Sequence, residues 1–589
     1  MNAPVSDQRE FRYRKLIDLG IALSAERHHN RLMELILSGA KELTNSDGGT
    51  LYLHDRDEKA LKFAIVLNDT LQIALGGTTG KSITFPPLKL YDAEGHPNHK
   101  NISTEAALTG RTVTIADAYD TESFDFSGTK AFDANTGYRS QSFLTVPLKN
   151  HEGDVVGVLQ LINARTPDGT VVPFPEETTG LVEALASQAA VALDNQMLIE
   201  AQKKLFTAFI EVIANAIDAK SPYTGGHCRR VPALTNMLTR AACEATHGIF
   251  TQFDLTEDEW YELEVAGGLH DCGKVTTPEY VVDKATKLET IYNRLHEIRT
   301  RFEVVKRDAE IAYWRGVAEG GDKDKLAAER DARWAQLDEE YAFVAECNIG
   351  GEFMSADKVE RLKQIAATTW LRTLDDTIGV SWEEARRKPK EKPALPALEH
   401  LLSDKPEHVV PHDMPAMQPD NPWGFKIRPP AQKFNLGELY NLSVARGTLT
   451  NEERYHINDH IVQTIIMLDA LPFPKNLRRV SEWAGGHHEK LDGTGYPKGL
   501  TKEQMSIPAR AMAIADIFEA LTARDRPYKT PKKLSECIKI LSFMRKDQHI
   551  DPDLFELFLT SGVYKDYADA FLNPDQIDEV DISQYVTKV

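Results

Sequence analysis

Residues 265–274 read VAGGLHDCGK, and residues 485–497 read GGHHEKLDGTGYP. The first stretch carries a His-Asp pair and the second carries a His-His pair. If the first stretch is helical, Lys274 lies one turn after His270 and on the same side. Imidazoles and a bridging carboxylate are suitable ligands for divalent metal ions, and an ammonium group nearby could hold a phosphate oxygen. The two stretches therefore predict a metal centre.

The length and charge of the chain limit what it can be. With 589 residues, two or three domains are expected, because one hydrophobic core rarely grows that large. A net charge of −20 argues against broad binding to nucleic acid. No apolar run reaches the roughly 18 residues that a membrane span needs, so we expect no membrane insertion. The first residues lack signal-peptide features and the five cysteines form no C-x-x-C pair, which favours a cytoplasmic protein with reduced thiols.

Residues 1–180 are typical of an α/β sensor domain, with an antiparallel sheet and helices. Short strand-like runs occur at 49–54, 62–67, 142–148 and 155–162. The last two flank Asn150–Asp154, where Gly and Asp tolerate the dihedral angles of a tight turn. We therefore expect a β-hairpin at this point.

A long helix is expected to follow over residues 181–221, where 41 residues contain neither Gly nor Pro. A continuous helix of that length would be about 60 Å long and could join two domains rigidly. The alternative is two ordinary helices with a break near Asp194-Asn195.

A helical domain is expected in two parts, 205–284 and 441–589, with an insertion at 285–440. A heptad seam within the insertion predicts a helix, and a turn around Gly320-Gly321 followed by a second seam predicts an antiparallel helical hairpin. The seam residues are Leu288, Ile291, Leu295, Ile298, Phe302, Val305, Ala309 and Ala312, then Trp334, Leu337, Tyr341 and Val344. The pair could protrude as a coiled coil or pack on the domain body.

The ten prolines between residues 389 and 430 favour an extended loop or linker over helices. A loop of this length inside a domain is usually functional or disordered. The insertion as a whole could be a lid, a dimerisation arm or a surface for a partner.

Taken together, several motifs resemble the HD-GYP family of cyclic di-GMP phosphodiesterases. The resemblance rests on His270-Asp271…Lys274 and on His488-Glu489…Asp492-Gly493…Gly495-Tyr496-Pro497. Supporting motifs are the segments around His227, around Leu449-Thr450 ahead of His460, and from Ala513 to Lys529. The likeness covers about residues 205–575 apart from the insertion, which replaces a connection that is usually short in the family.

The resemblance implies a site for two divalent metal ions, most simply iron or manganese, although zinc also suits the ligands. The implied metal ligands are His227, His270, Asp271, His460, His487, His488 and Asp516. Asp271 would bridge the two ions and act in catalysis together with Lys274. The implied substrate-binding residues are Gly495, Tyr496, Pro497, Arg526 and Lys529. Tyr223 stands where some family members have a Glu that helps to hold a third metal, so we expect two ions.

The N-terminal part resembles GAF domains of the cyclic-nucleotide-phosphodiesterase type. The likeness rests on runs such as Thr104–Arg111 and Leu144–Leu148, and on Gly157–Asn163. The motif that accompanies cyclic-nucleotide binding is broken, because Ala164 follows Asn163. The ligand of this domain is therefore unknown, and a domain that senses a cyclic nucleotide and one that only dimerises are both open.

The expected fold class is multidomain: a GAF-like α/β domain joined by a long helix to an all-α HD-GYP domain with a helical-hairpin and Pro-rich insertion. The expected activity is metal-dependent hydrolysis of cyclic di-GMP to pGpG or GMP, regulated by the GAF-like domain and carried by a homodimer. The alternatives are a non-catalytic effector that binds cyclic di-GMP or a partner protein, and a phosphohydrolase for another cyclic dinucleotide.

Overall fold

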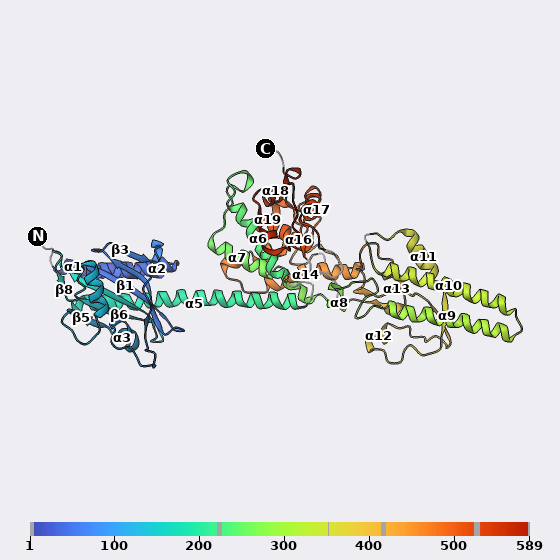
Figure 1. The fold of residues 1–589 in the computed structure, drawn as a ribbon, viewed down its shortest axis with the longest axis horizontal. Helices are drawn as coiled ribbons and strands as arrows, with labels where there is room; N and C mark the ends of the chain where they lie inside the picture. Colours follow the sequence, from blue (N-terminus) through green and yellow to red (C-terminus); the bar gives the residue numbers. More distant parts are fainter. Residues whose placement is uncertain (1–4, 221–225, 352, 414–419, 524–530, 587–589) are drawn as a thin grey trace. The chain divides into compact units, whose positions relative to one another are not determined.

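The computed structural model describes residues 5–220, 226–351, 353–413, 420–523 and 531–586 (Figure 1). The chain forms two compact units, Met1–Phe206 and Thr207–Val589. The division between them falls inside one continuous helix, α5 (Glu176–Lys220). This helix has no break near Asp194-Asn195, so the alternative of two separate helices is wrong.

The first unit is built on an antiparallel sheet with the strand order β3-β2-β1-β7-β6-β5. Its strands are β1 (Ser46–Asp55), β2 (Ala60–Asn68), β3 (Ile73–Gly76), β4 (Leu88–Lys89), β5 (Val113–Ile115), β6 (Phe143–Lys149), β7 (Val155–Arg165) and β8 (Val171–Val172). The predicted hairpin joins β6 to β7, and Gly153 in its turn has φ +86°, a conformation that a side chain would strain. The predicted antiparallel sheet is confirmed.

Helices pack on this sheet (Figure 1). They are α1 (Val5–Ala25), α2 (His29–Thr44), α3 (Ile102–Thr109), α4 (Ser127–Thr136) and the first part of α5. The main core joins buried side chains of α2, such as Ile36 and Leu37, to Leu159 of β7 and to Leu185 and Leu193 of α5. The start of α5 therefore belongs to the core of the first unit, because its apolar face is buried there.

The second unit is mainly helical, as predicted. Its helices outside the insertion are α6 (His227–Cys243), α7 (Glu257–Leu269), α8 (Glu279–Val282), α14 (Asn451–Asp469), α15 (Val480–Gly485), α16 (Ile507–Thr522), α17 (Leu534–Lys546), α18 (Pro552–Thr560) and α19 (Val563–Phe571), and α13 (Glu438–Leu442) lies across the end of the insertion. Helix α6 packs on α7 and α16, and α14 packs on α15 and on a short 3₁₀ turn at Cys272–Thr276. These contacts bring together segments that lie far apart in the sequence.

The insertion contains the predicted pair of antiparallel helices, α9 (Leu295–Ala318) and α10 (Lys323–Asn348), which run side by side (Figure 1). The start of the predicted seam is wrong, because α9 begins only at Leu295 and Ile291 is 94% exposed. The backbone N–H of Leu288 instead donates to the Asn348 side chain at the end of α10, which holds it in a turn. The seam also ends differently, because Tyr313 is buried and Ala312 is exposed.

The base of the hairpin is neither a free coiled coil nor a pair laid on the domain body. Buried residues of α9 and α10 share a core with Leu362 of α11 (Ala356–Ala366), Leu401 and Leu442 of α13. The remaining elements here are α12 (Trp382–Arg387), β9 (Thr369–Arg372), β10 (Ala397–His400), β11 (Val409–Val410) and β12 (Phe434–Asn435). The insertion therefore has a hydrophobic core of its own.

The described part of the Pro-rich stretch is extended, as predicted. Between α12 and residue 430, the described residues form short strands, turns and one 3₁₀ turn at Pro406–His408, and no α-helix. In the described part of the chain, none of the helices combines the length and apolar character that crossing a bilayer requires.

Candidate metal centre

Six of the seven predicted ligands fall into two groups of three. His227, His270 and Asp516 form one group, and His460, His487 and His488 form the other. Within each group, the ligand atoms lie within 4.8 Å of one another.

The seventh predicted ligand, Asp271, lies between the two groups. Its Oδ2 atom is 2.9 Å from His227 Nε2 and 3.3 Å from His270 Nε2. Its Oδ1 atom is 3.2 Å from His460 Nε2, on the other side. Each carboxylate oxygen thus points at a different group, which is the arrangement that a bridging ligand needs.

Helix ends supply most of these side chains. His227 is the first residue of α6, His270 directly follows α7, and the 487–488 pair follows α15 after one further glycine. The helix interiors supply two, His460 on α14 and Asp516 on α16.

The predicted helical step between His270 and Lys274 is wrong. Helix α7 ends at Leu269, and Cys272–Thr276 form a 3₁₀ turn instead. Lys274 still reaches the centre, because its Nζ lies 2.5 Å from Asp271 Oδ2.

A glycine with no predicted role explains why the chain turns there. A Cβ atom on Gly273 would lie 1.9 Å from the backbone oxygen of His460, a distance that real side chains do not reach. The N–H of Gly273 also donates to Thr464 Oγ1 over 2.9 Å. The absence of a side chain therefore lets the turn press against α14 and brings Asp271 next to His460.

Backbone carbonyls orient three of the histidines in the same way. The Nδ1 atoms of His270, His460 and His487 each contact the carbonyl oxygen three residues earlier in the chain. Such a contact assigns the proton to Nδ1 and leaves the Nε2 lone pair free for a metal. In each case this Nε2 atom points into the centre.

His227 is held differently, by a carboxylate that the sequence motifs did not single out. Its Nδ1 lies 2.5 Å from Glu519 Oε2, and Arg230 donates to the other oxygen of Glu519 over 2.8 Å. Glu519 is only 1% exposed and stands three residues after Asp516 on α16. That spacing puts both carboxylates on one face of the helix, a signal that the sequence contained.

The donor atoms fit metal ions. Among the described residues, three buried atoms at the centre have no hydrogen-bond partner: His270 Nε2, His487 Nε2 and Asp271 Oδ1. Leaving a buried polar atom unpaired costs about 1–3 kcal/mol. Imidazole nitrogens with carboxylate oxygens are a common ligand set for first-row divalent metals. A cation at each group would satisfy these atoms.

The surroundings set the protonation of the ligands. Burial lowers the pKa of His487 to about 4, and burial together with His487 and His460 holds the pKa of His488 well below its usual range. Burial alone would raise the pKa of Asp271, but the Lys274 ammonium and His270 hold it far below its ordinary value. These three groups are therefore ready to bind a cation at neutral pH.

His227 and Lys274 have raised pKa values. Burial and the Lys274 charge oppose protonation of His227, but its hydrogen bonds to Asp271 and Glu519 raise its pKa to about 10. Burial also opposes the charge on Lys274, yet Asp271 and Asp516 raise its pKa. Lys274 is therefore positively charged at neutral pH.

The predicted GYP loop lies beside the second group. The ring of Tyr496 stacks on that of His488, with centroids 4.9 Å apart and planes 20° apart. A Cβ atom on Gly495 would lie 2.2 Å from the backbone nitrogen of Lys490, so only glycine fits there. The carboxylate of Glu489, which the motif contains but which had no assigned role, accepts from the N–H groups of Lys498, Gly499 and Leu500.

Two predicted substrate residues, Arg526 and Lys529, lie outside the described residues, as does Tyr223. All seven predicted metal ligands, and Gly495, Tyr496 and Pro497, are described and lie in or beside the centre.

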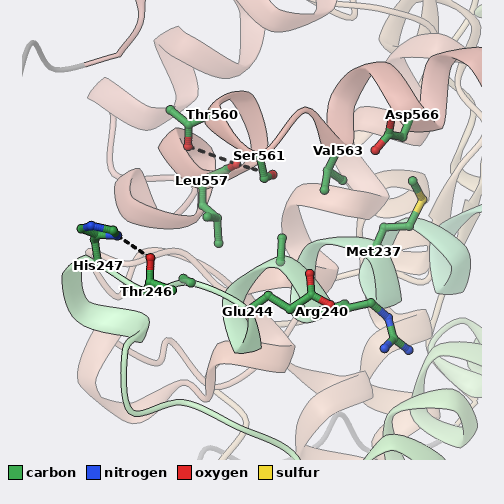
Figure 2. Close-up of a pocket in the computed structure, with 12 residues that line it drawn as sticks. Met237, Arg240, Glu244, Thr246, His247, Leu557, Thr560, Ser561, Val563 and Asp566 are labelled. Carbon is green, nitrogen blue, oxygen red and sulfur yellow. Dashed lines mark hydrogen bonds between the residues drawn. The ribbon is translucent and has the colours of Figure 1, made fainter.

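A separate groove lies on the same unit, between α6 and the α18–α19 pair (Figure 2). Its volume is about 620 Å³, and its lining includes Arg240, Glu244, His247 and Asp566. Figure 2 shows these polar side chains spread along the groove, with the hydroxyl of Thr246 beside the His247 ring. None of its lining residues belongs to the metal centre.

Comparison with known families agrees with both predicted domains. Residues 28–193 match the GAF domain, and residues 396–554 match an HD domain. The HD match contains His460, the 487–488 pair and Asp516, whereas His227 and His270 precede it. The chain therefore contains a GAF domain and an HD domain, as the motifs predict.

Curated relatives match short stretches of this chain. The chain is 42% identical over 83 residues to a 3′3′-cGAMP-specific phosphodiesterase of Vibrio cholerae, a match that covers 14% of this chain and 19% of the relative. It is 43% identical over 79 residues to a cyclic di-GMP phosphodiesterase of Pseudomonas aeruginosa, covering 13% of this chain and 18% of that protein. The chain thus spans about a fifth of the length of these relatives.

A solved structure is similar to about a third of this chain. It is the GAF domain of an Acinetobacter phosphoenolpyruvate-protein phosphotransferase, which is 14% identical with a TM-score of 0.24. The match covers 32% of this chain and 98% of that structure.

Proposed function

We propose that this protein is an HD-GYP phosphodiesterase that hydrolyses cyclic di-GMP to pGpG or GMP with two divalent metal ions. The observation that carries the proposal is the position of Asp271, whose two oxygens face two separate groups of three ligands. The relatives named as cyclic dinucleotide phosphodiesterases support the same class of substrate.

The proposed ligands divide between two ions. His227, His270 and Asp516 would hold one, the other three histidines would hold the second, and Asp271 would bridge them. Two such ions, when bound, activate a water molecule and neutralise the negative charge on the phosphodiester. Iron or manganese is our proposal, because a ligand set rich in histidine and carboxylate suits either.

The remaining residues would bind and orient the substrate. Lys274 stays charged beside Asp271, so its ammonium can pair with a phosphate oxygen at the moment when negative charge increases there. The Tyr496 ring, fixed against His488, offers an aromatic surface at the edge of the centre for a guanine base. Gly495 and Pro497 would contribute backbone contacts to the nucleotide.

A second cyclic dinucleotide is a candidate substrate, since three of the relatives are named as 3′3′-cGAMP-specific phosphodiesterases. A non-catalytic effector would be favoured by the loss of a metal ligand, but all seven positions are occupied by suitable residues. Hydrolysis is therefore the function that the centre supports best.

The test is turnover by the full chain loaded without oxygen with iron and, separately, with manganese. Cyclic di-GMP and 3′3′-cGAMP are supplied in parallel, and the products are resolved by chromatography. We expect pGpG or GMP from cyclic di-GMP, and loss of both products in a His270→Ala/Asp271→Ala variant. Faster turnover of 3′3′-cGAMP than of cyclic di-GMP would mean that 3′3′-cGAMP is the preferred substrate. If the folded, metal-loaded protein hydrolyses neither dinucleotide, the proposal that it is a phosphodiesterase is refuted.

We further propose that the GAF domain binds a small molecule without a phosphate group. A cavity of about 340 Å³ in the first unit is lined by aromatic rings, including Phe63, Phe126 and Tyr138. Of the lining residues that the structure describes, one carries a charge, the carboxylate of Asp125, and none is Lys or Arg. A cyclic nucleotide phosphate would meet no cation there, which favours an uncharged ligand over cyclic AMP or GMP.

Regulation is proposed to reach the metal centre through the end of α5. The ammonium of Lys220, the last residue of α5, donates to the carbonyl oxygens of Lys274 and Val275 over 3.1 and 2.5 Å. Buried Ile210 of α5 also lies against Gly268, where a Cβ atom would approach to 2.5 Å. A shift of this helix would therefore displace the turn that directly follows Asp271.

A homodimer is proposed from the surface of α5. Val191, Leu198 and Leu205 follow each other at intervals of seven residues and are 49%, 57% and 59% exposed. An exposed apolar stripe with this period is typical of a helix that pairs with a second copy. Light scattering on the purified chain measures the mass directly, and a monomer at micromolar concentration would contradict the proposal.

A further inference from the structure

The insertion contacts the GYP loop through a short segment, Asn421–Ile427, which we call the strap. The N–H of Lys426 donates to the carbonyl oxygen of Pro497 over 2.7 Å. The Lys426 ammonium also lies 3.4 Å from the carbonyl oxygen of Gly499. Lys426 therefore contacts the loop that carries Tyr496 through both its backbone and its side chain.

Side chains anchor the strap to the domain body. Phe425 is 2% exposed and packs with Val462 and Ile465 of α14, two and five residues after the ligand His460. The ring of Trp423 stacks against that of Phe425, with centroids 5.9 Å apart. The Lys498 ammonium of the GYP loop lies 5.8 Å from the centre of the Phe425 ring, within cation–π range.

The conformation of the strap is fixed locally. The side-chain oxygen of Asn421 accepts from the N–H groups of Trp423 and Phe425, and its amide donates to the Phe425 carbonyl. Gly424 has φ +73°, which a residue with a side chain would adopt only with strain. The strap is thus a turn that its own hydrogen bonds stabilise.

The GYP loop is consequently held from two sides. Glu489 binds three successive N–H groups of residues 498–500, and the strap binds the carbonyl oxygens of Pro497 and Gly499. No contact of the strap with any of the seven metal ligands occurs among the hydrogen bonds, ion pairs and ring contacts of the described residues. The hydrogen bonds of the strap to the body of the domain therefore reach the loop, and Phe425 packs on α14 beside the ligand position.

We infer that the strap is a positioning element of the substrate site, through which the insertion sets the GYP loop for binding of the cyclic dinucleotide. The inference rests on the proposed function for the identity of the substrate, but the contact itself does not. The strap would act on substrate binding and leave the metal ions in place.

The test compares Phe425→Ala with Val462→Ala in the full chain. Both variants open a cavity in the same small core, but only the first removes the anchor of the strap. Hydrogen exchange at the N–H groups of Tyr496, Lys498, Gly499 and Leu500 is measured first, without substrate. We expect exchange about fivefold to tenfold faster in Phe425→Ala, which corresponds to the loss of roughly one hydrogen bond. We expect no change in the exchange rate in Val462→Ala.

Kinetics and metal content complete the test. In Phe425→Ala, the KM for cyclic di-GMP should rise about tenfold while kcat and bound metal stay near the wild-type values. Unchanged exchange in Phe425→Ala, or equal effects in both variants, would overturn the positioning role and leave only packing. If the wild-type protein turns over no cyclic dinucleotide, the proposed function fails, and the exchange measurement still decides the role of the strap.

Discussion

Replacing Glu519 with Gln should weaken metal binding without touching a metal ligand. Glu519 is 1% exposed and receives hydrogen bonds from His227 Nδ1 over 2.5 Å and from Arg230 over 2.8 Å. Burial opposes its charge, but these two partners lower its pKa to about 2, so it is a carboxylate at any ordinary assay pH. The substitution removes that charge while keeping the size and shape of the side chain.

The expected loss follows from the position of the carboxylate behind a ligand. A partner of this kind fixes the ring and increases the basicity of the opposite nitrogen, and its removal usually reduces metal affinity by about 10–100-fold. That range corresponds to about 1.4–2.8 kcal/mol. The NH₂ group of the Gln amide would also face either the His227 N–H or the Arg230 guanidinium, and two donors facing each other repel. We therefore expect a loss of metal affinity in the upper half of this range.

The assay is titration of metal-free full chain with manganese, by calorimetry or by competition with a chelator, and elemental analysis for the number of ions bound. Glu262→Gln is a matched control, because Glu262 is 2% exposed and accepts from Arg479 over 2.9 Å. It should lose stability without losing metal. Manganese affinity of Glu519→Gln within about twofold of the wild type would refute the role of Glu519, as would an equal loss in the control.

Three further predictions concern other parts of the second unit. Gly273→Ala should abolish binding of at least one ion, since its Cβ would lie 1.9 Å from the His460 carbonyl and 2.5 Å from the Thr464 nitrogen, both backbone atoms; elemental analysis measures the ion count. Lys220→Met should speed hydrogen exchange in residues 272–276 and change kcat while metal content stays constant, because the hydrogen bonds from α5 to that turn are lost. Arg301→Met should destabilise the insertion by about 3–5 kcal/mol, because it leaves the buried Glu438 carboxylate without its partner; hydrogen exchange in α13 reports this loss. Burial opposes the charge of Glu438, but Arg301 lowers its pKa below 4.5, so the stabilisation by this pair is present above pH 4.5 and is lost as the pH falls through the lowered value.

Each of these predictions has a control or a contrary outcome. Gly180→Ala on α5, where a Cβ atom meets nothing within 4 Å, should keep both ions. Lys204→Met, an exposed position on the same helix as Lys220, should leave exchange in residues 272–276 unchanged. Unchanged hydrogen exchange in α13 of the Arg301→Met variant at pH 7 would contradict the buried ion pair. So would an ion pair in the wild-type protein that stabilises the fold more strongly as the pH falls below 4.

Local motifs were enough to predict much of this protein. The His-Asp and His-His pairs predicted a metal centre, because two adjacent ligand-type residues on one segment are a local feature of the sequence. The helix α5 and the pair α9–α10 followed from the absence of Gly and Pro and from apolar periodicity, which are properties of nearby residues. The β6–β7 hairpin followed from its turn residues for the same reason.

Predictions were wrong where a distant contact overrides a local preference. Ile291 continues the seam in the sequence, but the hydrogen bond from Leu288 to Asn348 delays the start of α9 to Leu295. In a continuous helix, Lys274 would lie one turn after His270. The chain instead forms a 3₁₀ turn at this point, where Gly273 lies in close contact with α14.

Only the tertiary structure decided which residues act together across large separations. Glu519 lies 292 positions from His227, and Lys426 of the insertion lies 71 positions from Pro497, yet each pair is joined by a hydrogen bond. Side-chain periodicity and turn chemistry extend over a few residues, so they predict helices, strands and local motifs. Contacts such as these depend on how the finished helices pack, because burial and exact distance exist only once the chain is folded.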